Sequence, residues 1–149
     1  MKTTLILTVV VLTIVSGFNI SSGSEDPAKA EHFHSCHRWI KCSAEDKAAL
    51  DEFNACLNQI PAEKMKKFVK ILADFAKEKW SDLEAAYNNY CAWDGVRQNE
   101  YFVEVQRLVL EEYSETCADF FQIDSCTKMT QSTGCFVDLF NKVHAEEKC

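Results

Sequence analysis

The longest periodic stretch of this 149-residue chain is QNEYFVEVQRLVLEEYSETCADFFQ, residues 98–122. Its apolar side chains recur every three or four residues, at Phe102, Val105, Leu108, Val109, Tyr113 and Cys117. An α-helix has 3.6 residues per turn, so this spacing places them on one face. The stretch predicts an amphipathic helix that buries that face.

The same periodicity continues on both sides of this segment. It predicts further helices at 28–42, 44–59, 62–80, 82–93, 125–131 and 135–144, with Gly134 between the last two. Ser43 and Ser81 each precede an acidic residue by three positions, which is typical of a capping box at a helix start. No strand-type alternation extends over a useful length. The sequence therefore predicts an all-α fold, a compact bundle of five to seven short amphipathic helices.

The first 23 residues are typical of a secretory signal peptide. Lys2 is followed by the apolar run Leu5–Val15 and then by small residues up to Gly23. The apolar run of roughly a dozen residues is too short to cross a bilayer core of about 30 Å. We expect residues 1–23 to be removed and residues 24–149 to form a single soluble, secreted domain.

Eight cysteines follow this leader, and none lies within it. They are Cys36, Cys42, Cys56, Cys91, Cys117, Cys126, Cys135 and Cys149. Such a set in a secreted chain predicts up to four disulfides. The spacings include neither a redox C-x-x-C motif nor the short pairs of a zinc site. The sequence leaves the pairing open, because eight cysteines allow about 105 combinations.

The chain is acidic, with 16 basic and 23 acidic residues and a net charge of −7. This charge argues against nucleic-acid binding, because phosphates would be repelled. One predicted helix is nevertheless basic, and Lys64, Lys66, Lys67 and Lys70 are candidates for a binding surface. Alternatively, these lysines pair with acidic neighbours such as Glu111, Glu112 and Glu115, or face water. The overall acidity also argues against membrane binding.

Three histidines lie close together near the start of the predicted domain. His34 and His37 would share one helix face, and His32 would lie to the side. Neutral imidazoles this close predict a weak divalent-metal site. The alternative is a solvated helix face whose histidines make ordinary polar contacts.

No catalytic motif or phosphate-binding glycine loop is present, so we expect no enzymatic activity and no cofactor. Two classes of binding protein remain. The first is an extracellular effector that binds another protein, of a venom, salivary or defence type. The second is a carrier of a small apolar ligand, because the aromatic residues exceed what a small helical core requires; the alternative is that they simply fill the core. We favour the first class, the extracellular effector.

Two family resemblances bear on these alternatives. Cys91-Ala92-Trp93-Asp94-Gly95, with the aromatic pair and the cysteines that follow, makes residues 56–126 similar to the arthropod haemolymph glycoprotein family. That resemblance implies a helical, secreted, disulfide-bonded protein without an established activity. The spacing Cys117-x8-Cys126-x8-Cys135 also resembles the C-terminal cysteines of insect odorant-binding proteins, but the paired C-x3-C of that family is missing.

Overall fold

The computed structural model describes residues 31–43 and 45–149, and these residues form helices without any strand. The elements are α2 (Glu31–Cys42), α3 (Lys47–Leu57), α4 (Ala62–Ala76), α5 (Leu83–Ala92), α6 (Gly95–Ala118), the 3-10 turn η2 (Phe120–Gln122) and α7 (Ile123–Ala145). The prediction of an all-α, disulfide-linked bundle is therefore confirmed. The predicted signal peptide and the start of the first predicted helix lie outside the described residues.

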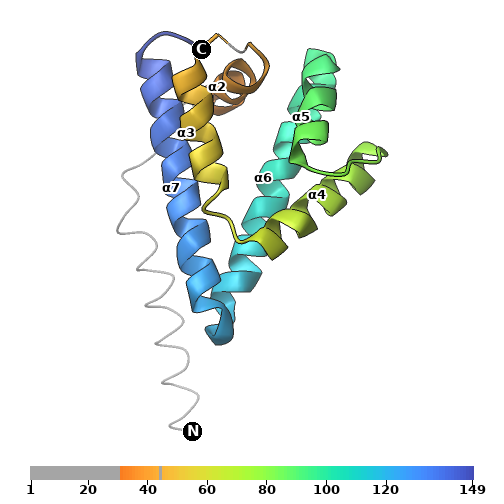
Figure 1. The fold of residues 1–149 in the computed structure, drawn as a ribbon, viewed down its shortest axis with the longest axis vertical. Coiled ribbons are helices and arrows are strands. Elements are labelled where there is room, and N and C mark those ends of the chain that lie inside the picture. Colours follow the sequence, from red (N-terminus) through yellow and green to blue (C-terminus); the bar gives the residue numbers. More distant parts are fainter. Residues whose placement is uncertain (1–30, 44) are drawn as a thin grey trace, which may run out of the picture. The chain divides into compact units, whose positions relative to one another are not determined.

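Helices α3 and α7 pack together, and α6 packs on α7 and on α4 (Figure 1). Helix α5 packs on α4. Residues His32–Cys149 form one compact unit. No helix among the described residues combines the length and the hydropathy needed to cross a membrane.

Aspartates start three of the helices. Asp46 accepts a hydrogen bond from the Ala49 N–H at 3.0 Å, and Asp82 accepts one from the Ala85 N–H at 2.9 Å. Asp94 starts α6 in the same way. The prediction that Ser43 and Ser81 open their helices was wrong, because an aspartate nearer the first helical turn takes the capping position.

Several predicted helix bounds differ from the structure, and two of the differences have a clear physical reason. Helix α4 ends at Ala76 and not at residue 80, because Lys77 adopts a left-handed conformation (φ 58°, ψ 38°) that closes it. The predicted break at Gly134 was wrong, since α7 continues through it. A glycine inside a helix costs only about 1 kcal/mol, and packing of α7 on α3 and α6 outweighs that cost.

All eight cysteines are paired. The disulfides are Cys36–Cys149, Cys42–Cys91, Cys56–Cys135 and Cys117–Cys126. They join α2 to the C-terminal end, α2 to α5, α3 to α7, and the two helices that meet at η2. The prediction of four disulfides is confirmed, and the structure selects their pairing.

Candidate functional site

The apolar core of the bundle consists of two separate clusters. The first joins α2, α3 and α7 and contains Cys36, Ile40, Ala49, Phe53, Leu139, Phe140 and Val143. The second joins α4, α5, α6 and α7 and contains Phe68, Leu72, Tyr90, Tyr101, Leu108 and Met129. Tyr87 packs against both.

A cavity of about 270 Å³ lies between these clusters, and we call it the central cavity. Its walls include Phe53 and Phe140 of the first cluster and Tyr101 and Met129 of the second. Burial raises the pKa of Tyr101 above its usual range, as expected for a hydroxyl in apolar surroundings. The volume exceeds the ~150 Å³ cavity that holds benzene and approaches the ~300 Å³ of small-ligand pockets.

A larger and more polar groove of about 1040 Å³ adjoins this cavity, and we call it the outer groove. The two share the side chains Leu57, Ile60, Met65, Leu83 and Tyr87. The rest of the groove is lined by asparagine and glutamine residues, by the charged residues Lys41, Glu84 and Lys128, and by a few apolar residues. A mainly apolar cavity thus shares one wall with a more polar groove.

Lys41 is a charged residue of the outer groove that contacts two rings of the cavity wall. Its ammonium nitrogen lies 4.1 Å from the ring centre of Tyr87 and 5.1 Å from that of Phe53, and both rings line the central cavity. Burial lowers the pKa of Lys41, while the charge of Glu84 opposes this effect. Among the described residues, no carboxylate lies within ion-pair distance of this nitrogen.

The predicted histidine cluster is divided by the fold. His37 is buried, and its Nδ1 lies 3.3 Å from the Tyr90 hydroxyl, while Nε2 of His34 lies 3.2 Å from the same oxygen. His32 instead stacks on His144 and lies 2.9 Å from Asn141. The structure therefore brings two of the three histidines together on one hydroxyl.

Burial has a large effect on the inner histidine of this pair. It lowers the pKa of His37 to about 3, with smaller contributions from the charges of His34 and Lys41. His144 also lies near the sulfurs of Cys36 and Cys149, but those sulfurs are joined in a disulfide and are not thiolate ligands. Metal binding by His32, His34 and His37 stays a prediction.

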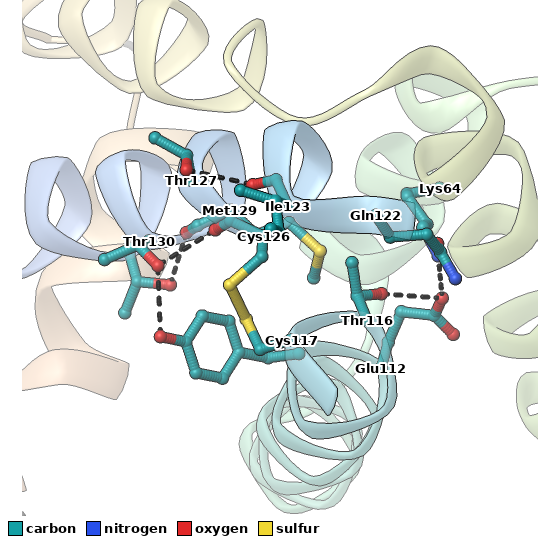
Figure 2. The surroundings of a disulfide bond; sticks show 12 residues. Lys64, Glu112, Thr116, Cys117, Gln122, Ile123, Cys126, Thr127, Met129 and Thr130 are labelled. Carbon is teal, nitrogen blue, oxygen red and sulfur yellow. Dashed lines mark hydrogen bonds and ion pairs between the residues drawn. A yellow bond between two sulfur atoms is a disulfide. The ribbon is translucent and has the colours of Figure 1, made fainter. Parts of the chain in front are cut away.

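The four candidate lysines of α4 differ in their surroundings. Lys64 and Lys67 both donate to the buried carboxylate of Glu112, and Lys64 also donates to Gln122 at 2.8 Å (Figure 2 shows Lys64). Burial raises the pKa of Glu112, but the two lysine hydrogen bonds outweigh it and the net shift is downward. Lys66 and Lys70 are exposed. The expected alternative, pairing with acidic neighbours, is confirmed for Lys64 and Lys67.

An exposed apolar patch lies where α6 meets α7. Phe120, Phe121 and Ile123 are 78%, 94% and 54% exposed, and we call them the corner patch. The Cys117–Cys126 disulfide closes this corner (Figure 2). The sequence analysis placed Phe120 and Phe121 at the end of an amphipathic helix and so missed the patch. The available signal was the two adjacent phenylalanines between Cys117 and Cys126.

Comparisons with known proteins add no relative. No protein-family model, curated protein or solved structure matches the chain. The two family resemblances therefore stay expectations, and the function is argued from the cavity and the surface.

Proposed function

We propose that the protein is a secreted, non-enzymatic carrier that holds a small apolar ligand in the central cavity. The observation that carries this proposal is the cavity itself, which lies between the two apolar clusters. The chain has enough aromatic residues to fill its core, and yet the cavity is present. Four disulfides and a leader typical of a signal peptide support an extracellular location.

The lining of the cavity favours binding over catalysis. Its walls are mainly aromatic, aliphatic and methionine side chains, which bind by excluding water. The hydroxyl of Ser132 donates to the carbonyl of Cys56 at 2.9 Å and not to a histidine. A serine held in this way lacks the base that an active nucleophile requires.

The test compares two substitutions of the same kind on α6. Val109→Phe places a larger side chain in the cavity wall, whereas Val103→Phe adds it at a position that is 55% exposed. We expect the wild-type protein and Val103→Phe to bind the fluorescent probe N-phenyl-naphthylamine with blue-shifted emission. Val109→Phe should bind it at least about tenfold more weakly while keeping its helical circular dichroism.

Organic extraction of the native secreted protein provides a second measurement. Mass spectrometry of the extract should detect a low-molecular-weight apolar compound that is depleted from Val109→Phe. Equal probe binding by all three proteins would contradict the carrier proposal.

The corner patch favours a second candidate function, binding of an extracellular protein. Monomeric proteins rarely expose contiguous large aromatic side chains, and such residues are enriched at binding hot spots. A photoreactive phenylalanine analogue at position 121 should cross-link one extracellular protein of the source tissue. The same analogue at Leu110, which is 65% exposed, should not.

A further inference from the structure

The position of Lys41 bears on the chemistry of the ligand. Lys41 lies in the last turn of α2, and the next residue, Cys42, is bonded to Cys91 of α5. Tyr87, under the ammonium group, is on the same helix as Cys91, one turn earlier. A disulfide therefore holds the cation against the aromatic wall of the cavity.

The charges of the outer groove leave this ammonium group without a close anion. Lys128 is paired with Asp124 at 2.7 Å. Glu84 influences Lys41 through space but lies beyond ion-pair distance. A partly buried cation without a hydrogen-bonded anion is unfavourable, and a negatively charged ligand group would relieve that cost.

We infer that the ligand is a single-chain amphiphile with a carboxylate head, whose apolar tail occupies the central cavity and whose head binds Lys41 in the outer groove. This inference rests on the proposed carrier function. A volume of about 270 Å³ fits one aliphatic tail of medium length, and the groove leaves room for a hydrated head. The cation–π contacts with Tyr87 and Phe53 fix the ammonium group at the junction of the two spaces.

The experiment compares three compounds that share one tail: decanoate, decanol and decyltrimethylammonium. Each is titrated by calorimetry into the disulfide-bonded protein secreted by cells that express the full chain. We expect decanoate to bind roughly tenfold or more tightly than decanol, because only its carboxylate accepts a charge-assisted hydrogen bond from Lys41. Decyltrimethylammonium should bind most weakly.

Three variants assign the head-group preference to one side chain. Lys41→Met keeps the length of the side chain and should weaken decanoate about tenfold while leaving decanol unchanged. Lys66→Met, at an exposed position of α4 outside the groove, should change neither affinity. Glu84→Gln removes the competing negative charge and should strengthen decanoate binding.

The outcomes separate this inference from the function on which it rests. If decanol binds as well as decanoate, or if Lys41→Met leaves decanoate binding intact, the carboxylate inference is wrong and the carrier proposal survives. If none of the three compounds binds, both are wrong. Should Lys41→Met fail to fold, Glu84→Gln and the comparison of head groups still decide the question.

Discussion

Acidification from pH 7 to pH 5 is expected to destabilise the protein through His37. Its imidazole is 8% exposed and contacts the rings of Phe53, Tyr87, Tyr90 and Phe102. Its hydrogen-bond partner is the neutral hydroxyl of Tyr90, and the positive charges of His34 and Lys41 repel a protonated imidazole. The folded protein therefore disfavours the protonated ring.

The size of this loss of stability follows from the pKa values of His37 in the folded and unfolded states. His37 has a pKa of about 3 in the folded state and about 6.5 in the unfolded chain, so the unfolded state binds the proton first. Stability is then lost as the pH falls below about 6.5, at up to about 1.4 kcal/mol per pH unit. Between pH 7 and pH 5 the loss is about 2 kcal/mol. Burial also lowers the pKa of the partly exposed His34, with a contribution from Arg38, and its effect has the same sign.

The assay is urea unfolding with intact disulfides, followed by far-ultraviolet circular dichroism at several pH values from 7 to 5. The carboxylates with lowered pKa values titrate below this window, so their stabilising effect is lost only at lower pH; they are Asp46, Asp82, Glu104, Glu112 and Asp119. His37→Gln should abolish most of the pH dependence, whereas His34→Gln should keep most of it. A wild-type protein equally stable at pH 7 and pH 5, or a His37→Gln variant with the wild-type slope, would refute the reasoning.

Three further predictions concern the ion pair, the long helix and the cavity. Glu112→Ala leaves the nearly buried ammonium group of Lys64 without its carboxylate and should lower the free energy of unfolding by about 3–5 kcal/mol in the same urea assay. The control Glu115→Ala removes an exposed carboxylate 3.9 Å from Lys67 and should lower it by less than about 1 kcal/mol. Gly134→Ala should stabilise the protein by about 0.5–1 kcal/mol, because a Cβ atom there meets no atom within 4 Å and alanine favours the helix; an unchanged or lower urea midpoint would contradict this. Within a series of saturated fatty acids, the affinity measured by calorimetry should rise about fourfold for each added methylene, which corresponds to about 0.8 kcal/mol. The rise should stop when the central cavity is filled, and an affinity independent of chain length would show that the tail is not buried.

The helical architecture could be predicted from the sequence because it depends on a repeated signal. Each stripe of apolar residues at spacings of three and four identifies a helix and its buried face. The errors lie where a single residue was taken to start or end a helix. Gly134 contributes about 1 kcal/mol against the helix, and tertiary packing of α7 outweighs it.

The site was less predictable, because it depends on how helices meet. The excess of aromatic residues indicated a cavity, but its position depends on the fit between two clusters whose members are far apart in the chain. No sequence pattern marked Lys41, whose contact with the cavity wall depends on how α2 lies against α5, to which it is bonded through Cys42. The disulfide pairing also requires spatial proximity, and spacing alone leaves it open.

The crosslinks help so small a domain to accommodate a cavity between its two apolar clusters. A cavity of about 270 Å³ costs up to about 6 kcal/mol at ~24 cal/mol per Å³, which is comparable with the whole stability of many domains. Cys42–Cys91 links α2 of the first cluster to α5 of the second, and Cys117–Cys126 closes the α6–α7 corner of the second cluster. At about 2–4 kcal/mol each, they offset a cost of that size. A ligand that fills the cavity would add its binding free energy to the stability of the fold.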